Sequence, residues 1–223
     1  MRVFTYSIFA VPLLFLDAVL FYTLPGRLAG RFTAMQGGIL LCGAVLYVAF
    51  HFLVRKPERL YLWGHELTHL VVAKLFLRHV HGFHITSRSG GKVVIDRTNV
   101  AIDLAPYAVP LYNLAAIGPV LLFGGEYSRL REIYLAAAAF LFTMHLSFSL
   151  EGFIHGQPDL RRSGRIFSGA VVILFLLLWL PILWAPGTPS GFRGIAGFYR
   201  EWIASGYSVL NGLLPRIGIK NIF

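Results

Sequence analysis

The sequence predicts an all-α polytopic membrane protein, and three observations lead to this fold class. Hydrophobic residues make up 57% of the 223 residues and charged residues 13%, about half the charged share of soluble domains. Apolar segments recur along the chain, each about long enough to cross the hydrocarbon core of a bilayer. Short stretches rich in basic residues, Gly and Pro separate them. We therefore expect one membrane-embedded domain over residues 1–223 with about six membrane segments.

The N-terminal part, residues 1–54, is expected to hold two spans. Val3 to Leu24 is apolar except for Asp17, and Ala34 to Val54 follows a short basic turn. A cleaved signal peptide is the competing interpretation of the first segment, but its length and the lack of a small-residue cleavage site favour a retained span. The second span carries glycines that suit close helix packing: Gly37, Gly38 and Gly43.

The segment from Leu60 to Leu77 carries the motif His65-Glu66-Leu67-Thr68-His69. Because helix positions i and i+4 share one face, His65 and His69 can bind the same metal ion. Glu66 lies beside them and can accept a proton from water. Two imidazoles, one carboxylate and an open position are typical of catalytic zinc, so one Zn²⁺ per chain is expected. The alternative, two solvated histidines, is disfavoured because the segment is apolar on most sides.

Residues about 79–103 change character and predict a β-hairpin with a turn at Ser87 to Gly91. Its edge near Val93 to Ile95 is expected either to pair with an extended substrate segment or to act as a lid without substrate contact. Three histidines alternate with apolar residues in the first strand, and exposed polar positions are favoured over a metal cluster: His79, His81 and His84.

Three further segments and a tail complete the chain. Ala105 to Gly124 is apolar but contains three prolines, so we expect a kinked span. Ile133 to Leu150 is the next span, and residues 166–186 form the last. The tail, residues 187–223, mixes aromatic and basic residues and predicts an interfacial amphipathic helix.

A catalytic zinc site needs a third protein ligand. Asp159 is favoured because it follows the helix-breaking sequence Gly156-Gln157-Pro158 and precedes basic residues that stabilise its ionised form. The alternative role for Asp159 is the N-cap of the final span. His155 and Glu151 are the next candidates for the third ligand. Asp103 and His145 are the remaining ones.

The positions of the basic residues favour one topology. If every segment crosses fully, His65 and Asp159 lie on opposite membrane faces and cannot share a metal ion. If residues 60–77 and the hairpin form a re-entrant unit, both lie on the cytoplasmic face, together with twelve of the sixteen Lys and Arg residues outside the tail. The re-entrant arrangement is therefore favoured. The net charge of +10 is spread over short loops, which fits lipid headgroups and excludes a nucleic-acid partner.

Taken together, these residues resemble the site-2 protease family of intramembrane zinc metalloproteases. The resemblance covers about residues 60–167 and rests on the His-Glu-x-x-His motif in a membrane helix, the following hairpin and the distant Asp159 after a proline. It implies zinc bound by His65, His69 and Asp159, with Glu66 as the base that activates water. It also implies a membrane-spanning or membrane-anchored protein substrate, and we expect a multi-pass protein of a bacterial inner membrane.

The chain departs from the second motif of that family, N-x-x-P-x-x-x-x-D-G. Glu151 stands at the Asn position, Ile154 at the Pro position and Leu160 at the Gly position. We expect no PDZ-like domain, and the sequence indicates no oligomeric state. Two alternatives stay open: a non-proteolytic protein with a structural metal site that acts in binding or assembly, and a transporter, although no repeat of two halves is visible.

Overall fold

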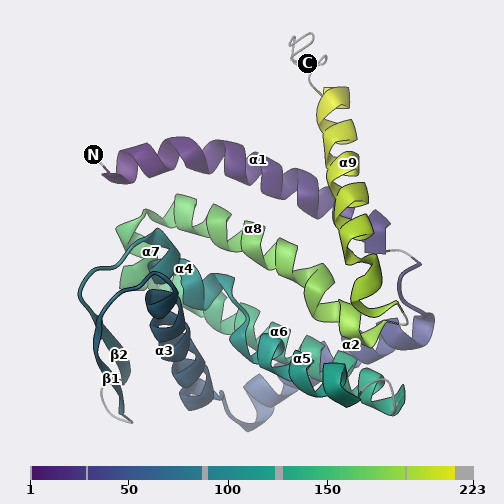
Figure 1. Cartoon of the computed structure of the whole chain (residues 1–223), viewed down its shortest axis with the longest axis horizontal. Helices are drawn as coiled ribbons and strands as arrows, with labels where there is room; N and C mark the ends of the chain where they lie inside the picture. Colours follow the sequence, from purple (N-terminus) through teal and green to yellow (C-terminus); the bar gives the residue numbers. More distant parts are fainter. Residues whose placement is uncertain (1, 29, 87–89, 124–127, 189, 214–223) are drawn as a thin grey trace.

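The computed structural model describes residues 2–28, 30–86, 90–123, 128–188 and 190–213. Apart from one hairpin, the described chain is built from helices (Figure 1). In chain order the elements are α1 (Arg2–Leu28), α2 (Ala34–Ala49), the π-helix η1 (Phe50–Val54), α3 (Glu58–Leu75), β1 (Val80–Thr86), β2 (Gly90–Ile95), α4 (Val100–Ala108), α5 (Leu111–Phe123), α6 (Ser128–His155), α7 (Pro158–Arg162), α8 (Arg165–Trp184), the 3₁₀ helices η2 (Ala185–Gly187) and η3 (Gly191–Gly194), and α9 (Ile195–Leu213).

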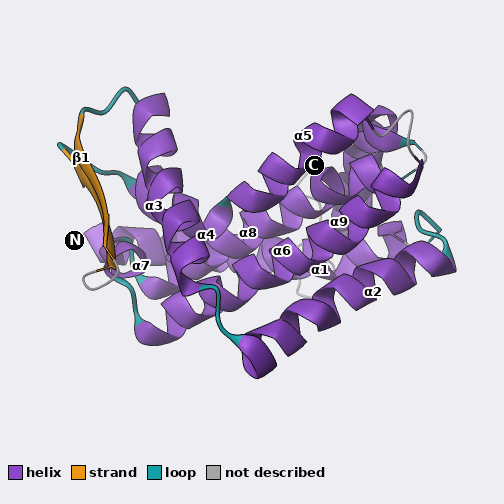
Figure 2. Cartoon of the chain, turned by 90° about the horizontal axis from the view of Figure 1, so that it is seen from below, coloured by secondary structure: helices purple, strands orange, loops and turns teal. Residues whose placement is uncertain are grey.

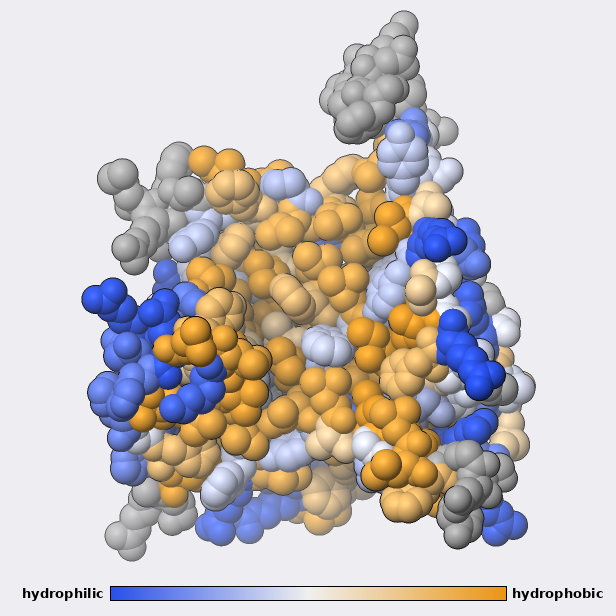
Figure 3. Space-filling model, viewed as in Figure 1, coloured by the Kyte–Doolittle hydropathy of each residue, from blue (hydrophilic) through white to orange (hydrophobic). Residues whose placement is uncertain are grey.

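Helices long and apolar enough to cross a membrane confirm the prediction of a polytopic helical protein. There are four in the described residues, or five if the bent pair α4 and α5 forms one span. The four are Tyr6–Leu28, Ala34–Val54, Arg129–His155 and Arg165–Gly187. Apolar side chains form a band across the middle of the molecule, with hydrophilic groups at both sides (Figure 3). The structure therefore supports four or five of the six expected segments, and α3 is not among them.

The helix α3 and the hairpin lie together at one end of the helix bundle, where α7 is also found (Figures 1 and 2). The chain reaches this place because α2 continues into the π-helical turn η1 and then becomes extended at Arg55, with φ −170° and ψ 139°. Pro57 precedes the first turn of α3. The negative charge of Glu58 in that turn lies near the positive end of the helix dipole and stabilises the helix.

The hairpin is shorter than expected. β1 and β2 pair antiparallel from Val80 opposite Ile95 to Thr86 opposite Gly90, with an irregularity between Val80 and Gly82. Residues 87–89 of the expected turn lie outside the described residues. The hairpin does not extend to residue 103, because Asn99 caps a new helix by accepting a hydrogen bond from the backbone N–H of Ile102 at 2.9 Å.

The kink predicted for residues 105–124 takes the form of two helices, α4 and α5, bent by 61°. Pro110 lies between them and has no backbone N–H to continue the ladder of α4. The side-chain amide of Asn113 in α5 donates to the carbonyl of Ala138 in α6 at 2.7 Å, which fixes the second half of the pair. The buried side chains of Leu104 and Tyr107 face a core shared with α5, α6 and α8.

The first span leaves one acidic group inside the protein. Asp17 of α1 is 4% exposed, and neither of its carboxyl oxygens has a hydrogen-bond partner in the described part of the chain.

The α1 helix packs against α8 and α9, and the indole N–H of Trp202 in α9 donates to the carbonyl of Leu20 at 3.1 Å. The expected helix of the tail is thus present as α9, which crosses the ends of α1 and α8 steeply (Figure 1). Its interfacial position stays a prediction.

Close packing between α2 and α6 depends on one of the three predicted glycines. A Cβ atom on Gly43 would lie 2.2 Å from the backbone oxygen of Ala136, whereas Gly37 and Gly38 have open space around them. The backbones of α2 and α6 therefore approach each other at Gly43, as small residues allow in membrane helix pairs.

Substitution Gly43→Val is expected to destabilise the protein by about 1–3 kcal/mol, because the new side chain meets helix backbone and cannot rotate away. Thermal unfolding in detergent measures this loss. Gly38→Val is the matched control: the same change on the same helix should leave the melting temperature nearly unchanged. Equal melting temperatures for both variants would contradict the packing described here.

Candidate metal centre

The two histidines of the motif face the same direction from α3. Their ring centroids lie 4.9 Å apart, as expected for helix positions i and i+4. His69 is buried and His65 is partly buried. The Nδ1 atom of His69 donates to the backbone carbonyl of Ile102 at 2.8 Å, which leaves Nε2 as the nitrogen that would bind a metal ion. The capped first turn of α4 therefore orients one of the two imidazoles.

Asp159 reaches these histidines because the chain turns sharply between α6 and α7. Gly156 has a positive φ of 65°, and two hydrogen bonds, from Gly156 to Phe153 and from Gln157 to Gly152, close the end of α6. Pro158 then starts α7 at a position where a missing N–H costs nothing. The helix-breaking sequence noted above thus places Asp159 in the first turn of α7. The alternative N-cap role is wrong, since Gly164 precedes the first residue of α8.

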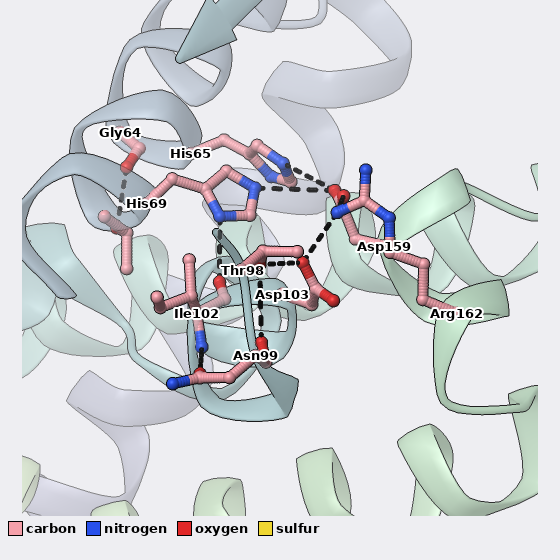
Figure 4. A network of polar contacts seen from close by, with 10 residues as sticks. Gly64, His65, His69, Thr98, Asn99, Ile102, Asp103, Asp159 and Arg162 are labelled. Carbon is pink, nitrogen blue, oxygen red and sulfur yellow. Dashed lines mark hydrogen bonds and ion pairs between the residues drawn. The ribbon is translucent and has the colours of Figure 1, made fainter. Parts of the chain in front are cut away.

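The three expected ligand residues meet at one point (Figure 4). Oδ2 of Asp159 lies 3.4 Å from Nε2 of His69 and 3.8 Å from Nε2 of His65. One ligand atom from each residue lies within 4.8 Å of the other two, and within the described residues this is the only such group of His, Cys, Asp and Glu. Two imidazole nitrogens and one carboxylate oxygen form a donor set suited to zinc, and the groups present therefore fit such an ion.

A second carboxylate and an arginine extend the polar network behind Asp159. Asp103 in α4 is buried and accepts hydrogen bonds from Thr98 Oγ1 at 2.5 Å and from Arg162 Nη1 at 2.7 Å. The same Nη1 atom lies 3.5 Å from Oδ1 of Asp159 (Figure 4). The two oxygens of Asp159 therefore face different partners, Oδ2 the histidines and Oδ1 the arginine.

The ionised form of Asp159 is favoured by this arrangement. Partial burial would by itself raise the pKa of the carboxyl group, but the imidazoles of His65 and His69 that face its Oδ2 atom outweigh burial and hold the pKa well below its usual range. A carboxylate that stays ionised at neutral pH is the form that binds a cation.

Glu66 points toward the hairpin and is 7% exposed. A Cβ atom on Gly91 of β2 would lie only 2.3 Å from Cγ of Glu66, so the strand touches the side chain directly where it has no side chain of its own. Beside them opens a cleft of about 460 Å³, a size common for ligand sites. Its charged and polar lining residues are His65, Glu66, His69, Lys92, Asp96, Thr98, Asp103, Gln157, Asp159 and Arg162.

None of the other candidate ligands belongs to this group: Asp103 lines the same cleft but is paired with Arg162, and the remaining three have other partners or are exposed. Glu151 accepts a hydrogen bond from Lys56 at 2.6 Å and lies 3.5 Å from His51. His145 is hydrogen-bonded to the carbonyl of Tyr107 at 2.8 Å, and His155 is exposed at the end of α6. The three hairpin histidines are exposed, as favoured above, and form no metal-binding group within the described residues.

Three residues of the site make contacts that the sequence did not indicate: Ile102, Gly91 and Arg162. The role of Ile102 is carried by its backbone carbonyl, which leaves no trace in residue type. Gly91 was assigned to a turn, and only the packing of β2 on α3 shows why a side chain is excluded there. Arg162 is one of the basic residues expected to stabilise the ionised form of Asp159, and its spacing of three residues could have indicated the direct contact on a short helix.

Comparisons of this chain with protein-family models, with curated proteins and with solved structures give no match. The resemblance drawn from the sequence motifs therefore remains a hypothesis that stands on the residues of the site.

Zinc binding is expected at about one ion per chain, and His65→Ala and Asp159→Ala should each weaken it. Loss of a ligand should cost more than the ~10–100-fold that follows loss of a residue that only orients one. Mass spectrometry of bound metal and competition with a chelator measure both quantities. His155→Ala, at an exposed site outside the group, is the control and should bind zinc normally. Wild-type affinity in Asp159→Ala would refute the third ligand.

A side chain at position 91 should separate the hairpin from α3. Gly91→Val must displace either β2 or the buried part of Glu66, at a cost of about 1–3 kcal/mol, so the amides of β1 and β2 should exchange with deuterium faster. Gly82→Val is the matched control on the partner strand, because the ring of His84 that it meets can rotate away. Unchanged exchange in Gly91→Val would show that the strand does not rest on Glu66.

Proposed function

We propose that this protein is a zinc-dependent endopeptidase that hydrolyses peptide bonds of membrane-spanning or membrane-anchored proteins. The observation that supports this most is the meeting of His65, His69 and Asp159 beside Glu66 at an open cleft. Three protein ligands with room beside them are typical of catalytic zinc sites, whereas structural sites are closed by four. The same reasoning makes zinc the proposed cofactor.

The position of the cleft supports a membrane-associated substrate. The ligand-bearing helices α3 and α7 lie at one end of a bundle of candidate membrane spans (Figures 1 and 2). A protein segment anchored in the same bilayer would reach this end by lateral diffusion, which favours such a substrate over a freely dissolved one. We further propose a bacterial inner membrane as the location and the cytoplasmic face for the cleft, on the basis of the positive-inside distribution.

The proposed hydrolysis uses the metal ligands to hold zinc and Glu66 to transfer a proton. When bound, zinc lowers the pKa of water toward neutrality and polarises a carbonyl group. His65, His69 and Asp159 would hold the ion, and the hydrogen bond from His69 to Ile102 keeps one imidazole in the ligating tautomer. Glu66 accepts a proton from the attacking water and passes it to the leaving amine. The low exposure of Glu66 limits competing solvent around this proton transfer.

The hairpin offers a way to hold the substrate extended. Within the described residues β2 pairs only with β1, so its other edge has unpaired backbone groups. Lys92, Val93 and Ile95 of β2 line the cleft. A substrate segment that pairs with this edge would expose its carbonyls, which a helical segment hides in its own hydrogen bonds.

One observation favours the second function, a binding or assembly protein with a structural metal site. The contact between Gly91 and Glu66 covers the proposed base with the hairpin. If this contact never opens, water and substrate cannot reach Glu66 together. Stoichiometric zinc that exchanges slowly, with no cleavage of any polypeptide, would support this alternative.

Substitution Glu66→Gln is expected to abolish cleavage while zinc stays bound, because the amide cannot accept the proton of water. The loss should be about 10²–10⁴-fold, measured on an unstructured polypeptide such as casein in detergent, with zinc content determined in parallel. Glu58→Gln removes an exposed carboxylate from the same helix and should cleave at the wild-type rate. Proteolysis retained in Glu66→Gln would refute the assignment of the base.

A further inference from the structure

Arg162 lies beside Asp159, one of the proposed ligands, at the wall of the cleft. Its Nη1 atom donates to Oδ1 of Asp103 at 2.7 Å and lies 3.5 Å from Oδ1 of Asp159. The side chain is 52% exposed and lines the cleft. An arginine on a free surface would be solvated on all sides, whereas this guanidinium is held at one end and open at the other (Figure 4).

Asp103 is the group that holds it. This carboxylate is 4% exposed on the first turn of α4, where it also accepts a hydrogen bond from Thr98. A buried carboxylate requires a partner of opposite charge, so the ion pair restrains the orientation of the guanidinium. Within the described residues only Nη1 contacts protein groups, and the donors on Nε and Nη2 of Arg162 are left for a ligand in the cleft.

A hydrogen-bond donor to the carbonyl oxygen would add to the polarisation that zinc supplies, and two other residues are poorly placed to provide one. Glu151, at the position where the resembled family has an amide, is negatively charged and engaged with Lys56, outside the cleft. Lys92 lies on the exposed side of the hairpin, with no carboxylate beside it to fix its position in the described residues. Arg162 alone among the cationic residues of the cleft is in contact with a proposed ligand.

We propose that Arg162 is a catalytic residue that donates hydrogen bonds to the carbonyl oxygen of the scissile peptide bond, and that Asp103 is its positioning residue. The inference rests on the proposed hydrolysis. When water attacks, a new carbon–oxygen bond forms, the π pair of the carbonyl moves onto its oxygen, and the proton of water passes to Glu66. The guanidinium stabilises the charge on that oxygen. The carbonyl re-forms as the carbon–nitrogen bond breaks, and the amine takes the proton.

The experiment compares the affinity of zinc-loaded protein for a phosphinic peptide, whose tetrahedral anionic group resembles the species formed by water attack. Titration calorimetry in detergent should show that Arg162→Gln binds this probe about 10–100-fold more weakly than wild type. Its zinc affinity should fall much less than that of Asp159→Ala, since the guanidinium of Arg162 contacts Oδ1 of Asp159 but is not itself a ligand. Asp103→Asn should weaken the probe less, because the guanidinium is loosened but present.

Two controls separate recognition from structural support. Arg161→Gln removes the same charge from the neighbouring residue, whose exposed guanidinium lies beside Gly156, and should bind zinc and probe normally. In Arg162→Ala, added guanidinium chloride should restore part of the probe affinity. Equal probe affinity in Arg162→Gln and wild type, or joint loss of zinc and probe, would overturn the role of Arg162. A wild-type protein without zinc affinity would refute the metal centre itself, a different result.

Discussion

The contact of the Asp159 carboxylate with the two motif imidazoles is the interaction on which the arrangement of this protein depends. The residues come from α3 and α7, and both helices must end up at the same end of the bundle for the atoms to lie within 4.8 Å of one another. When no metal ion is bound, a protonated imidazole of the motif attracts the ionised carboxylate of Asp159. The site therefore contributes to holding α3 on the bundle, and the bundle in turn places the site beside a cleft.

Two carboxylates share this region in different roles because their surroundings differ. Asp159 is partly exposed and directs one oxygen at the histidines, whereas Asp103 is buried and its partners are a hydroxyl and a guanidinium. The first is available to a cation from the cleft, and the second is already neutralised. This division explains why a sequence that offers several acidic residues near the motif presents only one of them for ligation.

Sequence patterns predicted the helical membrane fold and the meeting of His65, His69 and Asp159, because spacing on a helix and a helix-breaking Gly-Gln-Pro are local signals. The number of crossings was harder to predict, since α3 has the length of a span but carries the charges of the site. Ile102 and Gly91 were missed for another reason: a carbonyl and a missing side chain act only through long-range packing. The re-entrant topology, favoured on the positions of the basic residues and on the shared metal ion together, stays a prediction.

The steep crossing of α9 over α1 and α8 determines where the protein can be attached to a surface or a label. The C-terminal end of α9 lies at the opposite side of the molecule from the hairpin and α7 in Figure 1. Anything attached beyond that helix, whether a purification handle, a fluorophore or a surface linker, would leave the opening of the cleft unobstructed. Immobilised molecules could thus be presented to vesicles or detergent micelles with the cleft facing outward.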